Sequence, residues 1–269
     1  MIREERYGEV RAFEIARSVA GRAIWTVRIF LVGKVLIDTG PPNMRRAVLD
    51  LARRLQPEAV LVTHHHEDHA GNAAALAREL GLPVFASPLA VPLMADRFRE
   101  APFQILTWGR HVPAIAVPID EPLELGGLVL EPVAAPGHSP DMTCWWVRDR
   151  GLLFSGDLYL ADRIRFFRED ESFAQTMRSL EHVSGLDFEA LLCAHNPRPR
   201  NGPAHLRAKL SFMQGFQEEV AARAAQGQEP ARIAKELLGS DWFLRWFTSG
   251  RACSEHLVRS ALASQISGG

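Results

Sequence analysis

The chain has 269 residues, of which 47% are hydrophobic and 23% charged, and its formal net charge is −1. This composition predicts a globular protein with one substantial core, and the near-zero charge provides no global field that would attract nucleic acid. The 3 cysteines are too widely spaced for a disulfide framework, and neither a signal peptide nor an apolar run of about 20 residues is visible. We therefore expect a cytoplasmic protein without a membrane segment, for which nucleic acid is an unlikely partner.

The first half of the chain alternates short apolar strands with helices. An amphipathic helix is predicted from about 43 to 55, with Met44, Val48, Leu51 and Leu55 on one face. A second helix, at 71–80, ends at Gly81. The strands predicted in this half cover 9–16, 24–31, 35–38, 59–62 and 83–86. Residues 88–113 are interrupted by prolines and receive no assignment.

The second half begins with strands and ends with helices. The strands predicted here cover 114–118, 121–125, 128–134, 143–148, 151–155 and 190–194, with one helix at 171–183. The later helices cover 203–226, Pro230 to Leu238 with Gly239 as a stop, and about 253–265.

This order of elements predicts an α+β fold in which two sheets pack face to face with helices outside. We divide the chain into a domain over 1–202 and a helical extension over 203–269. The extension is expected to pack on the first domain, and a small winged-helix-like domain is the alternative. The aromatic-rich segment 241–247 can dock these helices, cover a cleft or mediate a homodimer.

A group of histidines and carboxylates follows the strand predicted at 59–62. The run Thr63-His64-His65-His66-Glu67-Asp68-His69-Ala70-Gly71 starts where that strand stops. Imidazole nitrogens and carboxylate oxygens are ligands that borderline divalent metals such as zinc prefer. Side chains two apart in extended chain point the same way, so His64 and His66 can reach one ion. A solvated polar loop or a metal-sequestering histidine tract is the alternative interpretation.

Three further residues of the same chemical types lie downstream, each behind an apolar stretch. They are His138 in Pro136-Gly137-His138-Ser139, Asp157 in Ser155-Gly156-Asp157, and His195 in Cys193-Ala194-His195. With Leu36-Ile37-Asp38-Thr39-Gly40 and the His-x-His-x-Asp-His run, these elements resemble the metallo-β-lactamase superfamily in order and spacing over residues 10 to 200. A simple polar loop would leave the ordered downstream residues unexplained.

The resemblance implies a four-layer αβ/βα sandwich that holds two divalent metal ions per chain. Zinc is favoured, and iron or manganese also fit the ligand types. The ligand set that it implies is His64, His66 and His138 on one ion, Asp68, His69 and His195 on the other, and Asp157 on both. Asp68 would also orient the hydroxide that attacks the substrate. His65 is left outside the set, and strand alternation predicts that it points away.

Several other residues are candidates for supporting roles. Asp38 is expected to accept the free N–H of a ligand histidine, or else to stabilise its own turn. Tyr159 is a candidate for substrate binding, and side-chain packing is the alternative. Arg163 and Arg165 can clamp an anionic substituent or form part of a solvated charged face. Thr63 and Asn72 are interpreted as local caps.

A small-molecule ester-type substrate is the favoured function. Enzymes of the superfamily that hydrolyse β-lactams with a cysteine ligand carry it where Asp157 stands, and its nucleases usually carry an inserted domain that this chain lacks. The resemblance therefore favours hydrolysis of a thioester, as in glyoxalase II, or of a lactone. A phosphodiesterase or ribonuclease and a non-catalytic metal-binding module are the alternatives.

Overall fold

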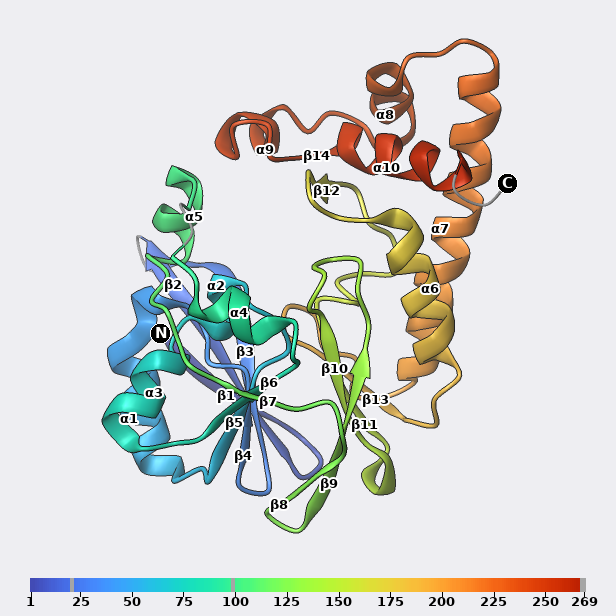
Figure 1. The fold of residues 1–269 in the computed structure, drawn as a ribbon. Helices are drawn as coiled ribbons and strands as arrows, with labels where there is room; N and C mark the ends of the chain where they lie inside the picture. Colours follow the sequence, from blue (N-terminus) through green and yellow to red (C-terminus); the bar gives the residue numbers. More distant parts are fainter. Residues whose placement is uncertain (20–21, 98–99, 267–269) are drawn as a thin grey trace.

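The computed structural model describes residues 1–19, 22–97 and 100–266, so the last three residues of the extension expected over 203–269 lie outside the described residues. Two sheets pack face to face, as the sequence predicted (Figure 1). The first sheet has the order β1-β2-β3-β4-β5-β6-β7 and the second β13-β11-β10-β9-β8. A two-stranded ribbon, β12-β14, lies apart from both.

The strands of the first sheet are β1 (Ile2–Tyr7), β2 (Val10–Val19), β3 (Arg22–Val32), β4 (Val35–Ile37), β5 (Ala59–Leu61), β6 (Val84–Ala86) and β7 (Val117–Pro118). Those of the second are β8 (Leu123–Leu125), β9 (Leu128–Ala134), β10 (Thr143–Val147), β11 (Leu152–Gly156) and β13 (Ala190–Cys193). The ribbon consists of β12 (Phe167–Arg168) and β14 (Ala252–Cys253).

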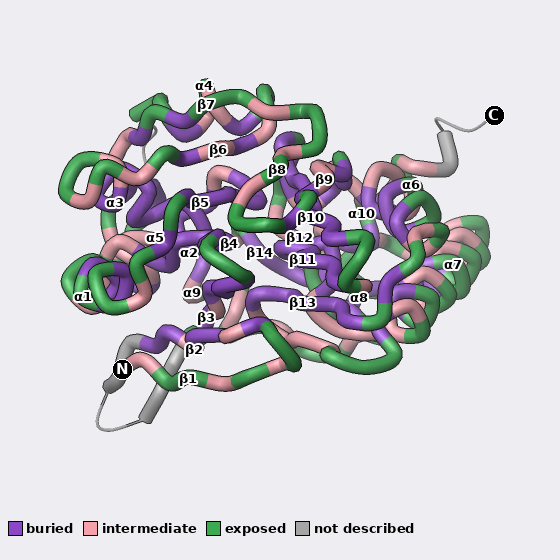
Figure 2. Tube along the Cα trace, turned by 90° about the horizontal axis from the view of Figure 1, so that it is seen from below, coloured by how far each residue is buried: buried purple, intermediate pink, exposed green. Residues whose placement is uncertain are grey.

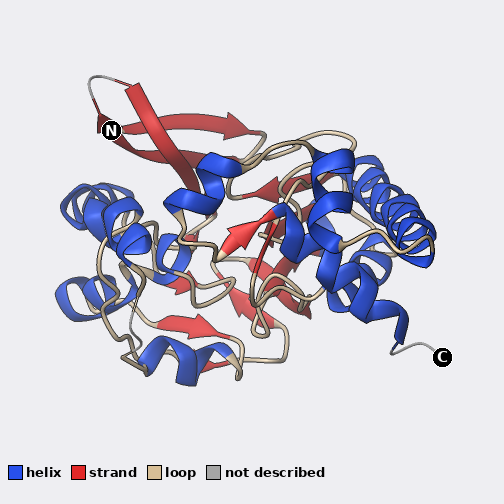
Figure 3. Ribbon diagram, turned by 90° about the horizontal axis from the view of Figure 1, so that it is seen from above, coloured by secondary structure: helices blue, strands red, loops and turns tan. Residues whose placement is uncertain are grey.

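Helices cover the outer faces of the two sheets, and others lie over one end of the sheets (Figures 1 and 3). Those of the first half are α1 (Arg45–Leu55), α2 (Glu67–Ala70), α3 (Ala73–Leu80), α4 (Ala90–Ala95) and α5 (Pro102–Thr107). Those of the second half are α6 (Phe173–Ser184), α7 (Gly202–Ala225), α8 (Pro230–Leu238), α9 (Trp242–Phe247) and α10 (Ser254–Ile266). No helix in the described part of the chain is long and apolar enough to cross a membrane.

Three buried clusters fill the spaces between these layers (Figure 2). Side chains of both sheets meet in the middle, where the rings of Phe30 and Phe154 lie 5.5 Å apart. Val48 and Leu51 of α1 pack on the outer face of the first sheet. The outer face of the second sheet packs on α6 and on α7, α8 and α10, whose buried side chains belong to one continuous cluster. The four-layer αβ/βα sandwich is confirmed, and the helical extension packs on it.

Several short elements were not predicted. The edge strand β1 has a charged sequence and little buried surface. Ion pairs to the neighbouring strand stabilise it instead, such as the one between Arg11 Nε and Glu4 Oε1 at 2.9 Å. Helices α4 and α5 occupy the segment left without assignment, and α9 forms within the aromatic-rich segment. Each is at most 6 residues long, so periodicity had too few turns to reveal it.

The loop that carries His138 packs directly against the first turn of α6. Gly137 has φ +144, and a Cβ built on it would lie 2.3 Å from Thr176 Oγ1 and 2.6 Å from Thr176 N. The Gly137 carbonyl accepts a hydrogen bond from Ser172 N at 2.8 Å. The close contact needs glycine, and it holds the following residue, His138, in place.

We expect Gly137→Ala to lower the free energy of unfolding by about 2–4 kcal/mol, because overpacking adds to an unfavourable backbone conformation. Urea unfolding followed by circular dichroism measures this. Gly127→Ala is the matched control, since Gly127 has φ +76 but nothing within 4 Å of a built Cβ. Gly127→Ala should lower the free energy of unfolding by only about 1 kcal/mol. Equal losses in both variants would show that the contact with α6 does not constrain the loop.

Candidate metal centre

The candidate ligands follow strands that run in the same direction within each sheet. In the first sheet, Asp38 follows β4 and the histidine run follows β5, and these two strands are parallel. In the second sheet, β11 and β13 are parallel, and two antiparallel pairings give β9 the same direction. Asp157 and His195 therefore lie at the same end of that sheet as His138, beyond the carboxyl ends of the strands. Carboxyl ends of strands are the usual place for ligand sites in such folds.

Three imidazole rings converge in a first cluster. His66 Nδ1 lies 2.9 Å from His64 Nε2 and 3.0 Å from His138 Nε2. Nitrogen atoms brought this close with their lone pairs inward form a set that can hold one metal ion. The first sheet supplies two of these rings, and the loop after β9 of the second sheet supplies the third.

A second cluster adjoins the first. His195 Nε2 lies 3.3 Å from Asp68 Oδ2, and His69 Nε2 lies 3.6 Å from the same oxygen. These three side chains can also hold a metal ion. Asp68 and His69 lie within α2, and the ring of His69 lies 4.1 Å from that of His64, so the two clusters are in direct contact.

Asp157 lies between the two clusters. Its Oδ2 is 3.3 Å from His138 Nε2 in the first cluster. Its Oδ1 is 3.4 Å from His69 Nε2 and 3.5 Å from His195 Nε2 in the second. One carboxylate thus presents one oxygen to each cluster, which is the geometry of a bridging ligand.

The electrostatics of both clusters favour cations. Burial lowers the pKa of His64 and that of His66 well below the usual value, so both rings are neutral and keep their lone pairs. Burial also acts to lower the pKa of His69 and that of His195, but the carboxylates of Asp68 and Asp157 outweigh it and raise both well above the usual value.

Buried polar atoms at the centre also lack partners. Among the described residues, His69 Nε2 and Asp157 Oδ1 are buried without a hydrogen bond. Such orphaned atoms are costly unless something else, such as a metal ion, satisfies them. The donor set therefore fits divalent metal ions, which would take the place of protons.

The residues behind the ligands hold their rings in orientation. His69 Nδ1 lies 2.8 Å from Asp38 Oδ2, so the hydrogen bond predicted for Asp38 is present. The Thr63 hydroxyl lies 3.0 Å from the Asp38 carboxylate and 3.1 Å from His64 Nδ1. Asn72 donates to three loop carbonyls, including that of Gly40. Asn72 stands at the N-cap of α3, as predicted, but its side chain makes no capping hydrogen bond there. The interpretation of Thr63 as a cap was wrong, because its hydroxyl contacts Asp38 and His64 instead.

Two further contacts behind the ligands were not predicted. His195 Nδ1 donates to the Thr26 carbonyl at 2.8 Å, and His138 Nδ1 lies 3.5 Å from Glu171 Oε1. Both partners are far away in sequence, so no motif spacing could have found them. The Thr26 carbonyl fixes the tautomer of His195, whereas Glu171 approaches His138 Nδ1 without a hydrogen bond.

His65 points out of the centre, as strand alternation predicted. Its backbone N–H donates to Asp141 Oδ2 at 2.7 Å, and its Nδ1 lies 2.9 Å from Asp141 Oδ1. Burial would raise the pKa of Asp141, but the hydrogen bonds and charge of His65 lower it. The central histidine of the run thus anchors the loop rather than joining either cluster.

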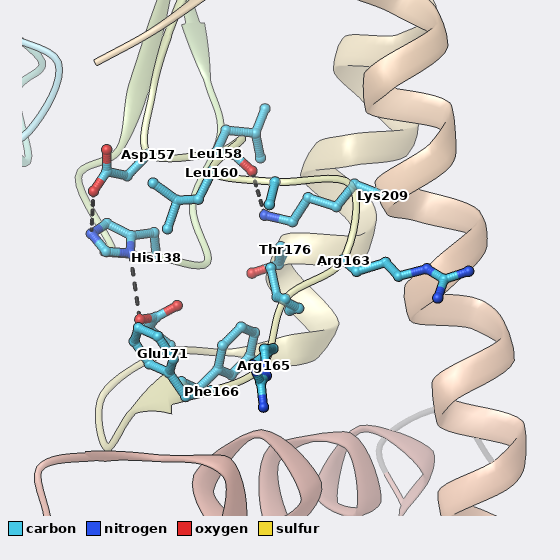
Figure 4. Close-up of a pocket in the computed structure, with 13 residues that line it drawn as sticks. His138, Asp157, Leu158, Leu160, Arg163, Arg165, Phe166, Glu171, Thr176 and Lys209 are labelled. Atoms are coloured by element: carbon cyan, nitrogen blue, oxygen red, sulfur yellow. Dashed lines mark hydrogen bonds and ion pairs between the residues drawn. The ribbon is translucent and has the colours of Figure 1, made fainter. Parts of the chain in front are cut away.

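Of the candidate substrate-binding residues, Arg163 and Arg165 line the smaller of two cavities at the site, whereas Tyr159 lines neither. Tyr159 is fully buried, and its hydroxyl donates to Asp162 Oδ1 at 2.6 Å and accepts from Arg198 Nε at 3.1 Å. Neither cavity described below is lined by it. Arg165 donates to the Leu238 carbonyl at 2.8 Å, and the guanidinium of Arg163 points away from His138 (Figure 4).

Two cavities meet at the ligands. The larger, of about 410 Å³, opens over both clusters and is lined by His66, Asp68, His138, Asp157 and His195, among others. The smaller, of about 260 Å³, lies behind His138 and Asp157 and is shown in Figure 4. Buried Lys209 of α7 lines it and donates to the Leu158 carbonyl at 2.6 Å. These volumes are within or just below the range of small-molecule sites, about 300–1,000 Å³.

Residues 26–195, which carry every candidate ligand, match the family model described as the metallo-beta-lactamase superfamily. The chain belongs to this superfamily. A hydroxyacylglutathione hydrolase of Methylobacillus flagellatus is 30% identical over 224 residues, which are 80% of this chain and 80% of that protein. The beta-lactamase-like protein 2 homolog of Caenorhabditis elegans is 25% identical over 61% of this chain. That match spans only 52% of the relative's length, so the chain covers about half of it.

Solved structures of the superfamily share the fold. A beta-lactamase domain protein from Burkholderia ambifaria aligns with a TM-score of 0.68 at 17% identity, covering 99% of this chain and 89% of that one. A metallo-beta-lactamase family protein from Thermus thermophilus aligns with a TM-score of 0.67 at 18% identity, covering 95% of this chain and 91% of that one. These alignments include the helices after residue 202, because both cover nearly all of this chain.

Lys209 should make stability depend on pH. Burial lowers the pKa of Lys209 to about 8, whereas the pKa of a lysine in an unfolded chain is about 10.4. Between these values the unfolded chain binds more protons than the folded one, so stability rises with pH. We expect the free energy of unfolding of the wild type to gain about 2 kcal/mol relative to Lys209→Met between pH 8 and pH 10.

Urea unfolding at pH 7.5, 9 and 10 measures this difference. Lys235→Met provides the matched control, because Lys235 is exposed on α8, and it should leave the shape of the curve unchanged. Parallel curves for the wild type and Lys209→Met would contradict the prediction.

Proposed function

We propose that this chain is a dinuclear metal-dependent hydrolase that cleaves a small-molecule thioester or lactone. The observation that carries the proposal is the carboxylate of Asp157, which faces the first cluster with Oδ2 and the second with Oδ1. A carboxylate in this position is suited to hold two ions a few ångströms apart.

In this proposal the ligands are His64, His66 and His138 for one ion, Asp68, His69 and His195 for the other, and Asp157 for both. Zinc is the favoured metal because imidazole and carboxylate are its common ligands, and iron and manganese remain compatible. When bound, ions of this kind would supply an acidified water as nucleophile and a positive charge that polarises the substrate carbonyl.

The remaining steps belong to the chain's own groups. Asp68 lines the larger cavity and is 7% exposed, so it can accept a hydrogen bond from the attacking water and orient it. Asp38 and Thr63 hold the rings of His64 and His69 in one orientation. The dry surroundings of these residues strengthen every charge interaction that develops during the attack.

The substrate class is supported by relatives and by the ligand set. A hydroxyacylglutathione, after which the Methylobacillus relative is named, is a thioester. Asp157 stands where the β-lactamases with a cysteine ligand carry that residue, which disfavours a β-lactam. Cys144, Cys193 and Cys253 are free and buried, which fits the reducing cytoplasm that this proposal includes.

Metal content provides the first test. Protein purified without chelator should contain close to two metal ions per chain by elemental analysis, and Asp157→Asn should retain about one or none, because it weakens both sites. His65→Ala, in the histidine run after β5, is the control, and it should keep both ions because His65 points out of the centre. A ceiling of one ion in the wild type with metal in excess would contradict the dinuclear proposal.

Substrate turnover provides the second test. The metal-loaded enzyme should hydrolyse a thioester or a lactone with a kcat/KM at least about tenfold above that for bis-nitrophenyl phosphate, RNA or a β-lactam, a difference of about 1.4 kcal/mol in activation free energy. Asp157→Asn should lose most of this activity. Faster cleavage of RNA or the phosphodiester would make the chain a nuclease. Two bound metals without any turnover would make it a binding module.

A further inference from the structure

Three aromatic side chains from distant parts of the chain meet above the larger cavity. Phe247 of α9 stacks on Trp25 of β3, with ring centroids 5.4 Å apart and planes inclined by 16°. Phe103 of α5 approaches Phe247 edge-on, with centroids 6.0 Å apart. All three line the cavity. Figure 1 shows α9, from the helical extension, reaching toward α5 of the first half. We call Trp25, Phe103 and Phe247 the aromatic bridge.

The backbone of β3 is distorted where it carries Trp25. Thr26 pairs with Ala16 and Ile24 with Arg17, so Trp25 is the extra residue of a bulge. It has φ +50, which is unfavourable for a bulky residue. Bulges beside active sites commonly redirect a side chain. The same bulge presents the Thr26 carbonyl to His195 Nδ1, so it both aims Trp25 and holds a candidate ligand.

The charges of the cavity leave no excess of positive charge for an anionic substituent. Its acidic lining residues are Glu67, Asp68, Asp157, Glu169, Asp170 and Glu171. Its guanidinium groups, those of Arg168 and Arg251, already pair with Asp170 at 3.2 Å and with Glu169 at 3.8 Å. Two divalent ions would only balance the remaining carboxylates. The lining that would contact the rest of the substrate, beyond the reacting carbonyl, therefore carries no net charge.

The rest of the lining is apolar. Trp108, Leu160, Phe166 and Leu244 extend the surface from the aromatic bridge toward the ligands. Phe166 is 42% exposed and Trp25 is 40% exposed, which is unfavourable for large apolar side chains unless a ligand covers them. Apolar pockets with a few polar groups at one end are typical of small-molecule sites.

We propose that the cleft selects thioesters whose acyl group is uncharged and apolar, either an aromatic group or an extended hydrocarbon chain, and that this group packs against the aromatic bridge. This inference rests on the proposed function and specifies its substrate class. The acyl carbonyl lies at the metal centre, and the apolar group extends toward Phe247 and Trp25.

A series of thioesters tests this selectivity. N-acetylcysteamine thioesters of acetate, lactate, succinate, octanoate and phenylacetate share one thiol and differ only in the acyl group. We expect kcat/KM for octanoyl and phenylacetyl to exceed that for lactoyl and succinyl by at least about tenfold, because each buried methylene adds binding energy. Equal or faster turnover of the lactoyl or succinyl thioester would overturn the inference while leaving the proposed function intact.

Two variants in α9 distinguish the loss of a ring of the aromatic bridge from a general effect of changing this helix. Phe247→Ala should lower kcat/KM for the octanoyl thioester about tenfold and leave the acetyl thioester within about twofold, since only the longer group reaches the ring. Trp242→Ala is the matched control, because Trp242 is 71% exposed and does not line this cavity. Phe103→Ala, on the opposite helix, repeats the test should Phe247→Ala misfold, as judged by circular dichroism.

Binding without turnover gives an independent measurement. A thioether analogue of the octanoyl substrate, with methylene in place of the carbonyl, should bind the purified protein in calorimetry. Phe247→Ala should weaken this binding about tenfold, and Trp242→Ala should not change it. Binding that depends on Phe247 without hydrolysis of any thioester or lactone would support the apolar site but contradict the proposed function. Binding that is absent, or independent of Phe247 and Phe103, would overturn the inference.

Discussion

Imidazole and carboxylate groups are buried together at the carboxyl ends of strands from both sheets. The surrounding structure must provide these groups with hydrogen bonds and opposite charges. Each such group is costly to bury without partners. Asp38 and Thr63 support the rings of His64 and His69, and the Thr26 carbonyl supports that of His195. Among the described residues, His69 Nε2 and Asp157 Oδ1 remain without a hydrogen bond between the two clusters, where a cation fits. The same arrangement explains the backbone of Asp38, whose φ of +61 is tolerated because its carboxylate holds three groups at once.

The centre also depends on how the two sheets are held together. Ligands from β5 and ligands from β9, β11 and β13 can meet only if the sheets keep their separation and alignment. Trp145 of β10 donates from its indole nitrogen to the Val62 carbonyl at 3.2 Å, and Thr143 N donates to the Thr63 carbonyl at 2.9 Å. The second sheet is thus bonded to the residues that immediately precede His64. Packing between Phe30 and Phe154 continues this interface away from the site.

The C-terminal helices contribute to both the core and the site. Leu206 and Met213 of α7 and Val258 of α10 are buried in the cluster under the second sheet. Pairing of Phe167 with Cys253 in the β12–β14 ribbon ties the segment after Asp157 to this extension. Phe247 reaches the cavity because that ribbon and α10 fix the position of α9. The extension therefore shapes the cavity over the candidate ligands.

The fold class and the candidate ligands could be predicted from the sequence, because both are encoded locally. Apolar strands end just before His64, Asp157 and His195, and strand alternation separated His65 from its neighbours. The residues that surround these candidate ligands are set by tertiary packing and could not be predicted in this way. Glu171, Thr26 and the aromatic bridge come from segments distant in sequence, and Tyr159 turned inward because Asp162 and Arg198 satisfy its hydroxyl. The physical reason is that secondary structure follows local periodicity, whereas burial and long-range contacts depend on how the sheets and helices pack.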